Sequence, residues 1–177
     1  MEYPEYQRHV LARASTAFHG DTVQARDLYT VLEEFCRAGN RLDEVKKALM
    51  YGRRFANTYT SGSDLNVGQM TGELDETEQG IIHAILGFAT EGVELVEALA
   101  KRIFDHEPFD NVNLQEEFGD GEWYRALGLH HLGQLHSANL AQNDAKLECR
   151  YGPVDAGFTY KAANERDLET ERKTLEG

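Results

Sequence analysis

Two pairs of acidic residues are the part of this sequence best suited to chemistry. Glu91 and Glu94 belong to the segment TEGVELVEAL, and Glu117 and Asp120 belong to QEEFGDGEWY. Each pair has i, i+3 spacing, so on a helix its two carboxylates share one face. Four carboxylates gathered across a helix bundle would repel one another unless a cation lay between them, and hard divalent cations prefer oxygen ligands. The pattern predicts a metal site, with Mg²⁺ as the metal, Mn²⁺ as a substitute, and a phosphate compound as the substrate.

The surroundings of the two pairs favour this prediction over its alternative, which is two solvated helix faces with ordinary exposed acids. Phe88 and Val93 flank the first pair, and Phe118 and Trp123 flank the second. Acids placed against apolar surface need a partner, because an unpaired buried charge costs several kcal/mol. A bound cation would be such a partner.

The apolar periodicity of the chain predicts an all-α protein whose helices must position these acids. The segment AGN at 38–40 is read as a stop between two helices, after which Lys46 is expected to point outward. The helix over 75–106 is apolar around a wide arc and is expected to pack on more than one side. Residues 58–73, rich in Gly, Ser, Thr and Asn, are expected to form a long connection. The predicted helices cover residues 5–18, 22–37, 42–57, 75–106, about 111–131 and 137–150, and a charged helix follows a short extended part in the tail.

Composition narrows the classes of function. The chain has 31 acidic and 18 basic residues and a formal net charge of −13, which argues against binding to a nucleic-acid polymer. It contains no apolar run of transmembrane length, and its first residues lack an apolar signal core, so we expect neither membrane insertion nor secretion. Cys36 and Cys149 have no CxxC partner and are expected to be free thiols. A cytoplasmic location is predicted.

The order of several segments resembles a known superfamily. ExxE followed by ExxD is similar to the signature of the all-α nucleoside triphosphate pyrophosphohydrolases, which include MazG, the dimeric dUTPases and the phosphoribosyl-ATP pyrophosphohydrolases. The segments HAILGFATEGVELVEAL, KRIFDHEPFDNVN, EEFGDGEWYRAL, NDAKLECRYG and GFTYKAANERDLETERKTLE resemble short phage-type MazG-like proteins across residues 82–176. The resemblance implies a helical extension over 1–70, a catalytic helical core over 71–152 and a tail over 153–177. It also implies a four-helix-bundle core completed in a homodimer or homotetramer.

The resemblance assigns roles to the acidic residues. Glu91, Glu94, Glu117 and Asp120 match the family's magnesium ligands, and Glu91 or Glu94 would also act as the catalytic base. The implied reaction is Mg²⁺-dependent hydrolysis of a ribo- or deoxyribonucleoside triphosphate to the monophosphate and pyrophosphate. The role would be to shape a nucleotide pool, in the host cytoplasm if the protein is phage-encoded, with a purine such as dGTP as a candidate substrate.

The resemblance also implies substrate-binding residues. Asn143, Lys146 and Arg150 match the family's NxxKLxxRY segment, and their spacing places them on one helix face. Lys101 would reach phosphates, and Trp123 would stack on the base. Ordinary surface cations and core packing are the alternatives for these residues.

One departure from the family pattern concerns the residues after the second acidic pair. Gly121 and Glu122 follow Asp120, where the family usually has apolar residues. Two other functions remain open: a non-catalytic helical nucleotide-binding or interaction protein, and a metal-dependent phosphohydrolase that releases orthophosphate.

Overall fold

The computed structural model describes residues 1–56, 62 and 65–176, and helices are its only regular elements over that part of the chain. The all-α prediction is confirmed. The chain forms two compact units, one of Asp21–Gly133 and the other of Met1–Gly20 with Gln134–Gly177. The predicted division into an extension, a catalytic core and a tail, with boundaries at residues 70 and 152, stays a prediction. Within the described residues, no helix combines the length and the apolar character needed to span a membrane.

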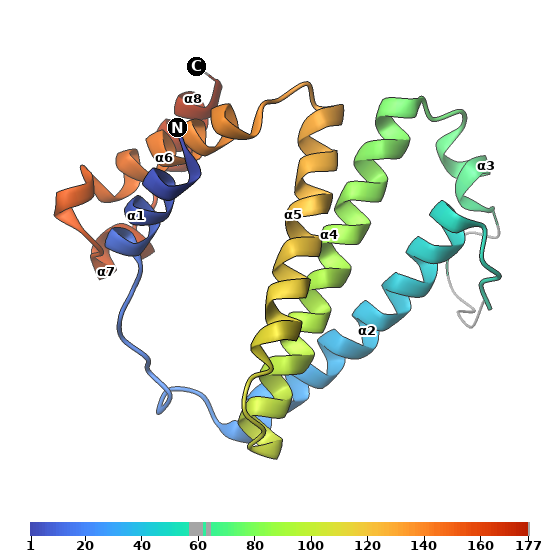
Figure 1. Cartoon of the computed structure of the whole chain (residues 1–177), viewed down its shortest axis with the longest axis horizontal. Helices are drawn as coiled ribbons and strands as arrows, with labels where there is room; N and C mark the ends of the chain where they lie inside the picture. Colours follow the sequence, from blue (N-terminus) through green and yellow to red (C-terminus); the bar gives the residue numbers. More distant parts are fainter. Residues whose placement is uncertain (57–61, 63–64, 177) are drawn as a thin grey trace. The chain divides into compact units, whose positions relative to one another are not determined.

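The unit Asp21–Gly133 is built on three long helices that lie side by side (Figure 1). The central helix α4 packs against both of the others, as its wide apolar arc predicted. The elements of this unit are α2 (Ala25–Tyr51), α3 (Val67–Thr71), α4 (Glu76–Ala100), the π-helix η1 (Lys101–Asp105) and α5 (Asn111–His131).

Capping side chains set where α4 and α5 begin. Asp75 and Glu78 form a capping box at the start of α4, which confirms the predicted start. Asp110 caps α5 by accepting hydrogen bonds from the backbone N–H groups of Val112 and Asn113.

Helix α2 replaces two predicted helices. The AGN segment at 38–40 does not end it, because Gly39 lies inside α2 where the helix crosses α4. A Cβ atom at Gly39 would lie 2.1 Å from Val93 Cγ2, so only glycine permits this close approach. The helix ends instead at Gly52, which has a left-handed conformation with φ 64°. Residues 57–61 and 63–64, which belong to the predicted helix end and connection, lie outside the described residues.

Much apolar surface of α4 and α5 is left uncovered within this unit. Ala84, Val93, Tyr124 and Leu129 are its buried apolar residues among those described. In contrast, Ile85, Phe88, Phe118 and Trp123 are each more than half exposed. The three helices therefore bury the apolar side chains that lie between them and leave other apolar side chains of α4 and α5 exposed.

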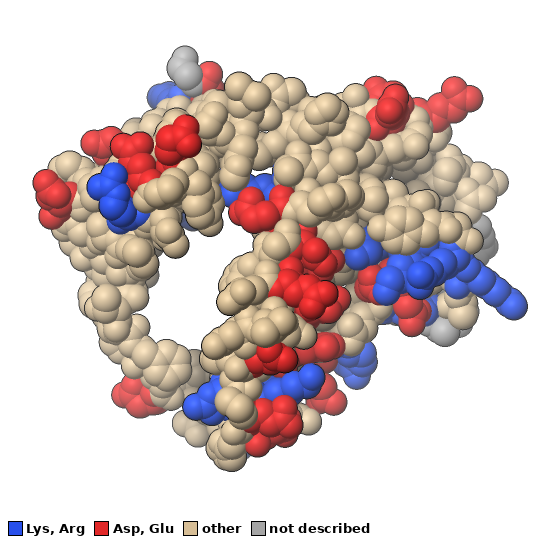
Figure 2. Space-filling view, viewed as in Figure 1, with Lys and Arg blue, Asp and Glu red and all other residues tan. Residues whose placement is uncertain are grey.

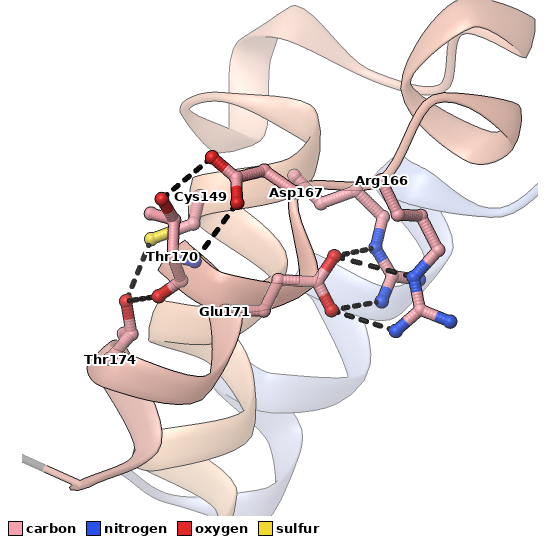
Figure 3. Close-up of polar contacts among 7 residues, drawn as sticks. Cys149, Arg166, Asp167, Thr170, Glu171 and Thr174 are labelled. Carbon is pink, nitrogen blue, oxygen red and sulfur yellow. Dashed lines mark hydrogen bonds and ion pairs between the residues drawn. The ribbon is translucent and has the colours of Figure 1, made fainter.

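The unit Met1–Gly20 with Gln134–Gly177 is centred on α6 (His136–Tyr151), which contacts the other helices of the unit. Its remaining elements are α1 (Tyr3–Arg13), the 3₁₀ helix η2 (Val154–Ala156), α7 (Tyr160–Asn164) and α8 (Leu168–Glu176). The predicted first helix extended to residue 18, but α1 ends at Arg13. The single charged tail helix is two helices, since Asp167 accepts hydrogen bonds from Thr170 and starts α8 anew (Figure 3).

Ion pairs hold this unit together. The buried Arg13 guanidinium donates to the Asp144 carboxylate at 2.6 Å and thereby ties α1 to α6. Glu171 of α8 accepts two hydrogen bonds from Arg150, at 2.8 and 2.7 Å, and also pairs with Arg166 (Figure 3). Each of these buried carboxylates is matched by a guanidinium, so the charges are balanced within the unit.

Candidate metal centre

Three of the four predicted ligands converge. Glu91 and Glu94 lie one turn apart on α4, and Glu117 lies on the adjacent α5. One carboxylate oxygen from each of the three lies within 4.8 Å of the other two. The i, i+3 spacing puts the first two on one face, and the packing of α4 on α5 brings the third to it. This carboxylate cluster has the donor set that hard divalent cations prefer.

Asp120, the fourth predicted ligand, lies beside the cluster. It is exposed on α5, one turn after Glu117, and is not part of the group whose oxygens converge. Its negative charge nonetheless reaches Glu91 and contributes to raising the pKa of that carboxyl group. Figure 2 shows acidic side chains gathered along the face where α5 lies.

Burial and mutual repulsion raise the pKa values inside the carboxylate cluster. Glu91 and Glu117 are only 7% and 6% exposed, whereas Glu94 is open to solvent. Burial, together with the neighbouring Glu94 and then Glu91, raises the pKa of Glu117 from 4.5 to about 7. Burial also raises the pKa of Glu91. The cluster therefore carries more negative charge than its surroundings balance.

Among the described residues, Lys46 of α2 is the cation that forms an ion pair with the cluster. Its Nζ atom donates to Thr90 Oγ1 at 2.8 Å, and pairs with Asp43 at 3.1 Å and with Glu91 at 3.7 Å. The ammonium group also lies 5.2 Å from the centre of the Tyr124 ring. Burial lowers the pKa of Lys46, but its bond to Asp43 and its other partners outweigh this and raise the pKa, so the side chain stays charged.

The predicted outward orientation of Lys46 is therefore wrong, since the residue is 5% exposed. Its neighbours Leu42 and Met50, each one turn away and half-buried, are the signal that could have placed it on the inner face.

Asn113 and Lys101 border the cluster on the side of the loop between η1 and α5. Asn113 donates from Nδ2 to Glu117 Oε1 at 3.1 Å, which orients that carboxylate. Lys101, a predicted phosphate ligand, lines a hollow of about 240 Å³ together with Glu94 and Asn113. Its placement beside Glu94 is compatible with the predicted role.

Trp123 lies on the opposite side of the cluster, among other aromatic rings. It is 56% exposed and lines a hollow of about 300 Å³ with Asp120, Tyr124 and Tyr51. His83 of α4 completes the group, and its Nε2 atom lies 3.2 Å from the Tyr51 hydroxyl. Burial and the charge of Lys46 lower the pKa of His83, so its ring is neutral at pH 7.

The three remaining predicted substrate ligands lie on α6, in the other unit. Asn143 donates to the Tyr6 hydroxyl, and Arg150 is held by Glu171 through two hydrogen bonds. Lys146 is half-buried on the same helix. Within their unit, Asn143 and Arg150 thus have structural partners that the sequence did not indicate.

Comparison with known proteins found no relative of this chain. No family model, no curated protein and no solved structure matched it. The assignment of a function therefore depends on the geometry and chemistry of the residues themselves.

Proposed function

We propose that the protein is a Mg²⁺-dependent, MazG-like nucleoside triphosphate pyrophosphohydrolase that converts a ribo- or deoxyribonucleoside triphosphate to the monophosphate and pyrophosphate. The convergence of Glu91, Glu94 and Glu117 from two helices is the observation that carries this proposal. Buried carboxylates at this spacing are unfavourable by themselves, and a divalent cation would relieve the repulsion that raises the pKa of Glu117.

The residues of the carboxylate cluster fit Mg²⁺ by their chemistry. All three offer carboxylate oxygens, and Asp120 is proposed as a fourth ligand although its oxygens do not converge with theirs. Asn113 provides the outer hydrogen bond that ligating carboxylates commonly have. When bound, Mg²⁺ would neutralise phosphate charge and make water a better nucleophile.

The chain's own residues divide the remaining work. The oxygen of a water molecule attacks the α-phosphorus, the bond to the bridging oxygen breaks, and pyrophosphate leaves. Glu91 and Glu94 are the proposed catalytic carboxylates. Glu94 is the one open to solvent and so accessible as an acceptor of the water proton, while Glu91 is held by Lys46.

Substrate contacts are proposed for the residues around the cluster. Lys101 would bind phosphate oxygens, and Trp123 would stack on the base. Asn143, Lys146 and Arg150 stay proposed substrate contacts, for which Asn143 would have to release Tyr6 and Arg150 would have to release Glu171.

A homodimer or homotetramer is proposed as the working form, with a four-helix core shared between copies. The exposed apolar residues Ile85, Phe88 and Phe118 support this, because α4 and α5 would bury them against a second copy. Phe88 lies beside α5, since a Cβ atom at Gly121 would be 3.9 Å from its ring. We place the activity in the cytoplasm, in shaping a nucleotide pool.

The test is a panel of nucleoside triphosphates incubated with Mg²⁺, with the products separated by anion exchange. Monophosphate and pyrophosphate are expected from a preferred nucleotide. Glu94→Gln should lower turnover by about 10²–10⁴-fold, the usual range for a general base. Glu76→Gln, an exposed acid at the other end of α4, is the matched control and should retain activity. Release of orthophosphate alone would contradict the proposal.

A non-catalytic nucleotide-binding protein is the second candidate. The ion pair between Lys46 and Glu91 favours it, because this pair neutralises part of the cluster without a metal. Nucleotide binding without turnover of any nucleotide, with or without Mg²⁺ or Mn²⁺, would support this candidate.

A further inference from the structure

Three helices contribute to a group of aromatic rings next to Asp120. Trp123 and Tyr124 of α5 pack edge to face, with ring centres 4.8 Å apart. The His83 ring lies edge-on to both, at 6.0 and 5.7 Å. Tyr51, at the end of α2, lies edge-on to His83 at 5.7 Å. Tyr51, Trp123 and Tyr124 line an open hollow of about 300 Å³ together with Asp120, at the lower end of the range for small-molecule sites, and His83 packs against these rings without lining it.

The hollow leaves large aromatic surfaces uncovered. Trp123 is 56% exposed and Tyr51 is 53% exposed, whereas Tyr124 behind them is buried. Aromatic faces that share one hollow suit a flat ring that stacks on them. The Tyr51 hydroxyl and His83 Nε2 are bonded to each other at 3.2 Å, which positions Tyr51, and the hydroxyl oxygen has further hydrogen-bonding capacity for the edge of such a ring.

The position of the hollow limits what the flat ring can be. Asp120 lines it, and the same carboxylate acts electrostatically on Glu91 of the carboxylate cluster. A ligand seated here would have its other end beside the proposed metal site. A nucleobase joined through a sugar to phosphates has this arrangement of a flat end and an anionic end.

We propose that this hollow is a nucleobase pocket in which Trp123 and Tyr51, positioned by its bond to His83, bind the base and determine which base is accepted. The inference extends the proposed function, because the base would belong to the nucleotide hydrolysed there. It gives a role to α2, which supplies Tyr51 and lies within the predicted N-terminal extension.

The experiment uses the fluorescence of Trp123, which is the only tryptophan of the chain. The full-length protein is titrated with nucleoside 5′-monophosphates in a metal-free buffer, with excitation at wavelengths that nucleotides do not absorb. A saturable change in emission is expected, strongest for the base that is preferred. Turnover of triphosphates is measured separately with Mg²⁺.

Variants of α2 show whether Tyr51 forms the pocket. Tyr51→Ala should weaken the binding of the preferred monophosphate roughly 5- to 100-fold, the usual effect of losing one stacking partner. Tyr29→Ala is the matched control, since Tyr29 is 51% exposed on the same helix but packs on Phe104. Tyr51→Phe keeps the ring and removes the hydroxyl, so it should retain affinity and change the preference among bases.

The outcomes separate this inference from the proposed function. Turnover with no change in Trp123 emission for any monophosphate, or equal affinities of Tyr51→Ala and Tyr29→Ala, would overturn the pocket and leave the hydrolase standing. Saturable emission changes that depend on Tyr51, without turnover of any triphosphate, would support the pocket and overturn the hydrolase.

Discussion

Two glutamates in the two units of this protein have opposite electrostatic environments. Glu171 is 4% exposed, yet its hydrogen bonds to Arg150 and Arg166 lower its pKa to about 2. Glu117 is 6% exposed, and burial together with neighbouring carboxylates raises its pKa to about 7. At the first site two guanidinium groups more than neutralise the single carboxylate, so it needs no further cation. The second has excess negative charge, which is the property expected of a site that takes up a cation.

The largest effect is expected from removing Lys46, the cation that pairs with the carboxylate cluster. Lys46→Met would leave Glu91 and Asp43 without their shared partner. Loss of one member of a buried ion pair typically costs about 3–5 kcal/mol, and we expect a decrease of this size in the free energy of unfolding. Urea denaturation measures it. Lys47→Met, which removes a more exposed partner of Asp43, is the control and should cost less than about 1 kcal/mol.

A divalent cation should stabilise the unit that contains the carboxylate cluster. At a concentration of 100 times Kd, Mg²⁺ would add about 2.7 kcal/mol to the free energy of unfolding. Thermal denaturation with increasing Mg²⁺ tests this. Glu117→Gln should remove most of the stabilisation and Glu171→Gln should leave it intact, whereas an equal response of the two variants would mean that the cluster is not the binding site.

Removing the charge of Glu171 should destabilise the protein moderately. Glu171→Gln removes the negative charge and one of the two acceptor oxygens to which Arg150 and Arg166 donate. Charge-assisted hydrogen bonds of this kind contribute about 1.5–3 kcal/mol each, so a loss of about 1–3 kcal/mol is expected after partial rearrangement. Chemical denaturation measures it, with Glu169→Gln as the control. Glu169 forms an exposed pair with Lys173. A loss above about 1 kcal/mol in Glu169→Gln would show that the ion pairs of Glu171 are no more stabilising than an exposed pair.

The two glutamates should also give opposite pH dependences. The folded protein binds a proton at Glu117 more readily than the unfolded chain, so stability decreases as the pH rises from 4.5 to about 7. For Glu171 the folded pKa is depressed, so its contribution is present above pH 4.5 and is lost as the pH falls towards about 2.

The slope in the upper pH range is the smallest expected effect, at most about 1.4 kcal/mol per pH unit for one proton. Denaturation at a series of pH values, without divalent metal, measures it. Glu117→Gln should flatten this slope and Glu171→Gln should not. An unchanged slope in Glu117→Gln would mean that its carboxyl group does not titrate in this range.

Several features of the fold were predictable from local patterns. The apolar periodicity located α4, α5 and α6 to within a few residues, because a long amphipathic helix repeats its signal over many turns. Glycine was the main source of error, since the same residue ends a helix or permits close packing. Gly39 was read as a stop, and it is in fact the contact point with Val93.

The candidate site, too, was predictable only as far as local patterns determine it. The i, i+3 pairs fixed which acids share a face of α4 and of α5, because that geometry is set within one helix. The sequence therefore determined by itself an all-helical chain with two acidic faces, an acidic overall charge and a tryptophan beside the second pair.

Only the tertiary structure decided which helices meet. It brought Lys46 and Tyr51 from α2 to the acids and aromatic rings of α4 and α5, and it gave Arg150 a carboxylate partner in Glu171. These pairings depend on contacts between segments far apart in the chain. Helical periodicity records which face of a helix is apolar, but it does not record which other helix covers that face.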